Sequence, residues 1–149
     1  MPLRSAPSLQ AKILLVDGNS AGLAARRTVL EEQGHKVWVA ANSADAFDQF
    51  GTQTFDIVVT DHKMPRMDGL GLIKKIHGVA PATPIVLLSG FVDALGLNEH
   101  TTGASAVIQK SAHEVTHLVR AVARLLKRKA PKKGSASEGR VARLKRAGA

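Results

Sequence analysis

The sequence contains no cysteine and few aromatic side chains, which make up 3% of its 149 residues. The lack of cysteine excludes a disulfide scaffold, a thiolate metal site and a cysteine nucleophile. No apolar run approaches the length of a membrane span, and residues 1–12 lack the continuous apolar stretch of a signal peptide. We therefore expect a soluble protein of the cytoplasm.

Charges of both signs are present, but they are unevenly distributed along the chain, whose formal net charge is +9. From Arg120 to the last residue there are 11 Lys and Arg and one acid, Glu138, whereas the first 119 residues carry a net charge of −1. This predicts a nearly neutral globular body and a basic tail. We expect a flexible leader over residues 1–11, one domain over residues 12–129, and a tail over residues 130–149 that is flexible or forms a short helix.

Five short apolar runs rich in β-branched residues predict the strands of a sheet. They are residues 13–16, 37–39, 57–60, 84–88 and 106–108. Because the runs are continuous and do not alternate with polar residues, both faces of the sheet should be covered, as in a parallel sheet. Helical spacing between the runs predicts a β–α unit repeated five times. The expected fold is therefore α/β, a five-stranded parallel sheet with helices on both faces.

Apolar spacing and capping residues predict where the helices begin and end. A first helix is expected over residues 20–33 with Gly34 as its C-cap, and Ser43 and Asp68 should cap the N-termini of the second and third helices. Residues 92–100 predict a single short helix. The last helix should bury an apolar stripe at helical spacing, formed by Val115, Leu118, Val119, Val122, Leu125 and Leu126.

A polar residue follows each of four predicted strands: Asp17 the first, Asp61 the third, Ser89 the fourth and Lys110 the fifth. The carboxyl ends of parallel strands form one edge of a sheet, where binding groups gather. Singly, such an aspartate is more often a helix cap, and such a lysine is more often solvated. The four together suit phosphoryl chemistry. One carboxylate can attack phosphorus, a second can hold Mg²⁺, the ammonium can pair with the phosphoryl group, and the hydroxyl can donate a hydrogen bond.

The segments around these residues resemble the receiver domain of two-component response regulators, over about residues 11–129. The resemblance rests on residues 13–17 (ILLVD), 55–61 (FDIVVTD), 64–69 (MPRMDG) and 84–90 (PIVLLSG), and on Gly103-Ala104 followed by Lys110. It implies a flavodoxin-like sheet with strand order 2-1-3-4-5.

The resemblance also implies a role for each site residue. Asp61 would be the phosphoacceptor, and Ser89 and Lys110 would bind the phosphoryl group. The Mg²⁺ ion would be held by Asp17, Asp61 and the backbone carbonyl of Lys63.

Three positions depart from the pattern of that family. Gly18 stands where a second acid, usually the direct metal ligand, would follow Asp17, and the loss of a carboxylate predicts weak binding of Mg²⁺. Val107 stands at the switch position that usually holds an aromatic residue, so a relay through an aromatic ring cannot operate unchanged. Ser111 stands where a proline normally follows the lysine. The side chain of Lys63 could lean into the site as a substitute cation, but exposure to solvent is the interpretation we favour.

We predict a single-domain response regulator, not a turnover enzyme, that accepts a phosphoryl group on Asp61 from a histidine kinase or a phosphotransfer protein. It would signal to a downstream protein, or to a second copy of itself, through its last two helices and fifth strand. The alternative is a degenerate receiver that acts as a phosphorylation-independent interaction module, which Gly18, Val107 and Ser111 favour. A third hypothesis is binding of nucleic acid or another polyanion by the basic tail. The lack of aromatic residues among its bases argues against sequence-specific recognition.

Overall fold

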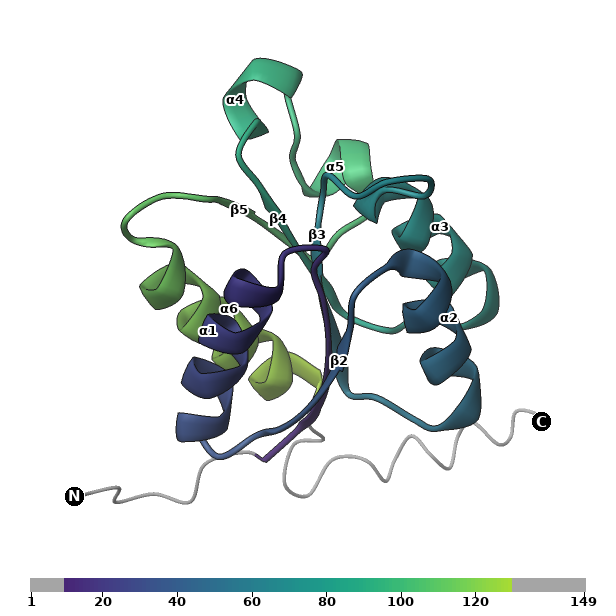
Figure 1. Cartoon of the computed structure of the whole chain (residues 1–149), viewed down its shortest axis with the longest axis vertical. Helices are drawn as coiled ribbons and strands as arrows, with labels where there is room; N and C mark the ends of the chain where they lie inside the picture. Colours follow the sequence, from purple (N-terminus) through teal and green to yellow (C-terminus); the bar gives the residue numbers. More distant parts are fainter. Residues whose placement is uncertain (1–9, 130–149) are drawn as a thin grey trace.

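Five parallel strands form the centre of the molecule, in the order β2-β1-β3-β4-β5 (Figure 1). The computed structural model describes residues 10–129, so the predicted tail and most of the predicted leader lie outside the described residues. The strands are β1 (Lys12–Val16), β2 (Lys36–Ala40), β3 (Ile57–Asp61), β4 (Ile85–Ser89) and β5 (Ala106–Gln109). The α/β fold that the apolar runs predict and the strand order that the family resemblance implies are both confirmed.

The described part of the chain also contains six helices, which lie on both faces of the sheet. They are α1 (Ser20–Glu32), α2 (Ser43–Thr52), α3 (Gly69–Val79), α4 (Val92–Leu95), α5 (Glu99–Thr102) and α6 (Glu114–Lys129). Helices α1 and α6 cover one face, and α2 and α3 cover the other (Figure 1).

The core is divided into two clusters because the sheet is buried on both faces. Along β1, Ile13 and Leu15 enter the cluster beneath α1 and α6, whereas Leu14 and Val16 enter the cluster beneath α2 and α3. Strands β3 and β4 are buried at every residue. This two-sided burial explains why the strand sequences are continuous apolar runs.

The segment between β4 and β5 differs from the single short helix predicted over residues 92–100. Gly96 adopts the left-handed conformation (φ 62°) at the end of α4, and Asn98 then begins α5 through a capping box with Thr101. Neither four-residue helix contains a buried residue. No buried side chain therefore holds the segment in one continuous helix.

The N-cap of α2 lies one residue before the predicted one. The side chain of Asn42 accepts a hydrogen bond from the backbone N–H of Asp45 at 2.7 Å, so Asn42 is the cap. Ser43 is the first helical residue, and its hydroxyl donates to the carbonyl of Met67 at 2.8 Å. Ser43 therefore joins α2 to the loop before α3 instead of capping its own helix.

The other helix ends lie close to their predicted positions. Asp68 caps α3, as predicted, by accepting from Gly71 N at 3.0 Å. Helix α1 ends at the C-cap Gln33, so Gly34 (φ 97°) lies one residue beyond the observed cap, which corrects the prediction.

The apolar stripe of α6 is buried except at its start. Four of the six predicted residues are buried, namely Leu118, Val122, Leu125 and Leu126, and Val119 is half-buried. Val115, in the first turn, is 43% exposed and does not belong to the core, which corrects the prediction. Across residues 10–129, every helix is too short or too polar to cross a membrane.

The register of the sheet brings the ends of the strands together. Val16 of β1 is paired with Thr60 of β3, so the next residues, Asp17 and Asp61, lie at neighbouring positions. Ser89 of β4 is paired with Gln109 of β5, directly before Lys110. The sheet therefore places all four predicted site residues at one edge.

Candidate functional site

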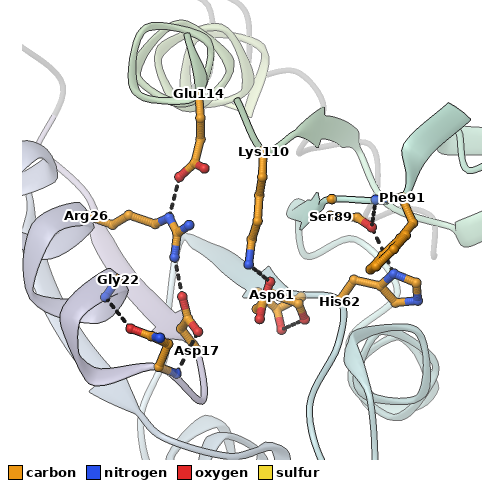
Figure 2. Close-up of polar contacts among 12 residues, drawn as sticks. Asp17, Gly22, Arg26, Asp61, His62, Ser89, Phe91, Lys110 and Glu114 are labelled. Atoms are coloured by element: carbon orange, nitrogen blue, oxygen red, sulfur yellow. Dashed lines mark hydrogen bonds and ion pairs between the residues drawn. The ribbon is translucent and has the colours of Figure 1, made fainter. Parts of the chain in front are cut away.

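Asp61 and Lys110 form the centre of the site (Figure 2). Asp61 is the last residue of β3 and is buried. Lys110 follows β5, and its Nζ lies 2.5 Å from Asp61 Oδ1. The contact is a charge pair and not a hydrogen bond, because Oδ1 has no hydrogen-bond partner among the described residues. A buried carboxylate oxygen thus faces an ammonium group and accepts no hydrogen bond from the other described residues.

The carboxylate of Asp17 is directed toward α1 (Figure 2). Its Oδ1 accepts a hydrogen bond from Asn19 N at 2.8 Å, and its Oδ2 forms an ion pair with Arg26 Nη1. Asn19 caps α1 and accepts in turn from Gly22 N at 2.9 Å. Asp17 therefore lies at the predicted edge, but both of its oxygens are already engaged.

Arg26 is a site residue that the sequence analysis does not identify. Besides Asp17 at the end of β1, it contacts Glu114 in the first turn of α6, with 2.5 Å between Nε and Oε2. Burial alone would lower the pKa of Arg26, but the hydrogen bond and charge of Glu114 and the charge of Asp17 raise it above its usual value. Arg26 lies between Leu23 and Leu30 on the buried face of α1, and a charged residue at that spacing is the signal that could have revealed it.

Ser89 is buried at the end of β4, and its hydroxyl already has two partners. Its Oγ lies 2.9 Å from His62 Nδ1 and accepts a hydrogen bond from Phe91 N at 3.0 Å. His62, the buried residue after Asp61, is a second residue that the sequence analysis overlooks, because a lone histidine beside a strand carries no specific pattern. If the hydroxyl of Ser89 donates to a phosphoryl oxygen, it can no longer donate its single proton to His62.

The loop after Asp61 is held close to β3. The backbone N–H of Gly69 donates to the carbonyl of His62 at 2.8 Å, and a Cβ at position 69 would clash with the backbone of Asp61 and His62. Glycine is therefore required there by close approach of the two backbones. The side chain of Lys63 is exposed, as we favoured, and its Nζ lies 5.5 Å from the centre of the Phe91 ring.

The two remaining unusual positions have ordinary structural surroundings. Val107 is half-buried on β5, paired with Leu87, and packs against the cluster beneath α2 and α3. Ser111 leads into α6: its Oγ accepts from His113 N at 3.1 Å, and its carbonyl accepts from Glu114 N at 3.2 Å. The consequences of both departures for signalling stay predictions.

The donor set around Asp17 does not fit a Mg²⁺ ion as it stands. Mg²⁺ requires near-octahedral oxygen ligands and is usually bound through one or two carboxylates. Both oxygens of Asp17 are engaged, one of them by the cation Arg26, and Gly18 offers no carboxylate. Within residues 10–129, no three His, Asp or Glu side chains are grouped so as to hold a metal ion. The metal role expected of Asp17, Asp61 and the carbonyl of Lys63 stays a prediction.

The chain is similar to known signalling proteins over most of its described part. The sequence profile of the response regulator receiver domain family matches residues 13–123. A gliding motility regulatory protein of Myxococcus xanthus is 28% identical over 131 residues, which cover 83% of this chain and 16% of that protein. The chain spans less than a quarter of the length of the curated relatives it matches.

Two solved receiver domains have the same fold. One, from Clostridium thermocellum, is 28% identical, with a TM-score of 0.72, over 80% of this chain and 96% of the other. The receiver domain of the Francisella response regulator 1452 is 27% identical, with a TM-score of 0.73, over 80% of this chain and 99% of the other.

Proposed function

This chain belongs to the response regulator receiver domain family, and on that premise we propose that Asp61 accepts a phosphoryl group from a histidine kinase or a phosphotransfer protein. Receiver domains are modules of two-component signalling and are not classical turnover enzymes. The chain matches only one part of the longer relatives.

The contact between Asp61 and Lys110 is the observation that carries the proposal. A carboxylate is a weak nucleophile, and it needs an unblocked lone pair and a partner for the negative charge of the incoming phosphoryl group. Asp61 Oδ1 accepts no hydrogen bond from a described residue, and Lys110 Nζ lies 2.5 Å away. The same ammonium can therefore pair with phosphoryl oxygens once the carboxylate has been phosphorylated.

The proposed transfer is a simple displacement at phosphorus. An oxygen of Asp61 attacks the phosphorus of a phosphohistidine, a P–O bond forms as the P–N bond breaks, and the imidazole nitrogen keeps the bonding electrons. Lys110 then pairs with the oxygens of the aspartyl-phosphate. The hydroxyl of Ser89, one strand away, donates to one of those oxygens if it turns away from His62.

The output surface that we propose is formed by α4, α5, β5 and α6. Phe91 and Leu95 are 48% and 53% exposed beside the end of β4, and Val115 is exposed at the start of α6. Exposed apolar side chains favour a protein partner over free solvent. Their neighbour Ser89, through its contact with Phe91 N, offers a route from the site to this surface.

Acetyl phosphate and intact-mass measurement test the proposal. We expect the wild-type protein to gain one phosphoryl group, slowly and only at high Mg²⁺, and we expect Asp61→Asn to gain none. Asp48→Asn is the matched control, because Asp48 is exposed on α2 and lies outside the site. The proposal fails if the wild type gains no mass at millimolar Mg²⁺ and acetyl phosphate, or if Asp61→Asn is labelled.

A phosphorylation-independent interaction module is the second candidate function. The observation that favours it is the pairing of Asp17 with Arg26, which leaves the site with a cation already in place. Failure of the labelling experiment, combined with binding of a partner by unphosphorylated protein, would establish this candidate in place of the first.

A further inference from the structure

Arg26 is a buried cation that the proposed phosphoryl transfer does not use. It lies on the inner face of α1, and its side chain is only 9% exposed. The guanidinium joins carboxylates from two other parts of the fold, Asp17 after β1 and Glu114 at the start of α6 (Figure 2). A buried guanidinium that has carboxylate partners on both sides is fixed in position.

Gly22 provides the space that Arg26 needs to reach Asp17. A Cβ at position 22 would lie 2.9 Å from Arg26 Nη1 and 2.9 Å from Asp17 Oδ2, closer than such atoms normally approach. Residues 22 and 26 are one helical turn apart, so the arginine side chain runs back along α1 over the glycine. The sequence thus contains both the cation and the gap that admits it.

Arg26 provides positive charge next to Asp17, where the family pattern would place a metal ion. Asp61 is paired with Lys110, and Asp17 shares Arg26 with Glu114, so both carboxylates at the strand ends already face a cation. A divalent ion at Asp17 would have to displace the guanidinium or approach a like charge at close range. We propose that Arg26 is a tethered counter-ion that takes the place of the divalent cation at Asp17 and thereby sets a weak affinity of the site for Mg²⁺.

Arginine suits this task because it stays charged and presents a planar array of donors. Its Nη1 and Nε engage different carboxylates, so Glu114 orients the guanidinium while Asp17 is neutralised. The charges of both partners also raise its pKa, so the cation persists through the physiological range. Arg26 is thus a positioning residue for Asp17, and it acts on the metal through that carboxylate.

The test compares divalent-ion binding in wild type, Arg26→Gln and Arg27→Gln. Binding of Mn²⁺ is followed by electron paramagnetic resonance with Mg²⁺ as competitor, and the unfolding temperature is measured with and without Mg²⁺. Arg27→Gln is the matched control, because it removes an exposed arginine one residue away that pairs with Glu31 and not with the site. The proposed role of Arg26 rests on the proposed function of the site, but its test needs no phosphoryl donor. Phosphorylation of Asp61 and metal control by Arg26 can therefore fail independently.

We expect Arg26→Gln to bind Mg²⁺ at least about tenfold more tightly than wild type, and Arg27→Gln to match wild type. We also expect Mg²⁺ at about 100 times its dissociation constant to raise the unfolding temperature of Arg26→Gln by roughly 5–10 °C. The same concentration is only about ten times the dissociation constant of wild type, so its unfolding temperature should rise by about half as much. Equal affinity in wild type and Arg26→Gln, or a gain in Arg27→Gln of the same size, would overturn the proposal.

Gly22→Ala decides the matter if Arg26→Gln does not fold. Its methyl group would lie 2.9 Å from both Arg26 Nη1 and Asp17 Oδ2 and would force the two groups apart, while the arginine and the helix are retained and alanine favours a helix over glycine. Tighter Mg²⁺ binding than in wild type would support the proposal, and unchanged binding would overturn it.

Gly18→Asp restores the missing acid at a position where a Cβ meets only the carbonyl of Ala41 at 3.8 Å. It should tighten Mg²⁺ binding, but less than the double variant with Arg26→Gln does, because Arg26 still holds Asp17. A gain in the double variant no larger than that of Gly18→Asp alone would contradict the role of Arg26.

Discussion

Val107 contributes to the protein through packing and not through a polar or charged group at the site. It has no hydroxyl and no ring, is half-buried, and contacts the cluster beneath α2 and α3. We expect Val107→Ala to lower the free energy of unfolding by about 0.5–2.5 kcal/mol, near the low end because of its partial exposure. Urea unfolding measures this change, and labelling of Asp61 should be unaffected.

Val59→Ala supplies the comparison, because Val59 is fully buried on β3. Its cost should exceed that of Val107→Ala, since a larger cavity stays unfilled. A Val107→Ala protein of normal stability that lost partner binding would show that this side chain carries the signal after all.

His35 makes the stability of the fold depend on pH. Its Nδ1 accepts a hydrogen bond from Ala11 N at 3.1 Å, and burial lowers the pKa of His35 below its usual value. The unfolded chain therefore binds more protons than the folded chain just below about pH 6.5. Stability should be complete above that value and should fall as the pH drops from it toward the lower pKa of the folded state.

Urea midpoints at about pH 5 and about pH 7.5 test this dependence. His35→Gln should lose less stability on acidification than wild type does, because it has no proton to gain. His100→Gln, a change at an exposed position of α5, should behave as wild type. Equal pH dependence in His35→Gln and wild type would refute the assignment.

At the scale of helices and strands, glycines with different backbone conformations should respond oppositely to alanine. Gly96 has φ 62°, whereas Gly78 lies within α3, where an added Cβ would meet no atom within 4 Å. Gly96→Ala should cost about 1 kcal/mol through left-handed strain, whereas Gly78→Ala should gain about 0.5–1 kcal/mol through helix propensity. Equilibrium unfolding of the two variants gives both signs, and a stabilising Gly96→Ala would mean that α4 has another conformation in solution.

Elements that depend on local pattern and two-sided burial could be predicted from the sequence. The strands follow from continuous apolar runs, and the Asp68 cap follows from its own side chain. The sequence does not show that two short helices form on either side of Gly96. Neither helix has a buried residue, so no apolar pattern marks where each begins and ends. The predicted cap of α2 was wrong because Asn42 and Ser43 are both good caps, and only the contact of Ser43 with Met67 separates them.

The site could be predicted only as far as strand ends determine it. Asp61 and Lys110 meet because parallel strands end at one edge, and no further information is needed. The pairing of Arg26 with Glu114 joins residues 88 positions apart, and its strength comes from burial that a local pattern does not show. The occupation of Asp17 is therefore a property of the packed α1 and α6, not of the motif around Asp17.

At the scale of the whole molecule, the uneven charge predicts that the basic tail, outside the described residues, governs contact with polyanions. Residues 1–130 carry a formal net charge of +4, and the last 19 residues add +5 in a short stretch, so duplex DNA should bind the full chain without sequence preference. Affinity should fall steeply between about 50 and 200 mM salt, and a chain of residues 1–130 should bind far more weakly. Fluorescence anisotropy with labelled DNA compares the two proteins.

Equal binding by the two chains would remove the tail from the interaction. Binding that does not respond to salt would rule out the electrostatic explanation, because released counterions are its source.

The two faces of the sheet are completed at different times while the chain is synthesised. The cluster beneath α2 and α3 draws its helix residues from Ala46 to Ile76, whereas the other cluster waits for Leu118 to Leu126 of α6. Synthesis runs from the N-terminus, so a ribosome-bound chain can cover one face while the other still exposes side chains such as Val86 and Ile108. That nascent chain exposes apolar surface to chaperones and to aggregation until α6 emerges. A stop codon shortly before α6 would therefore yield an aggregation-prone sheet with one face incompletely covered, and not a smaller receiver domain.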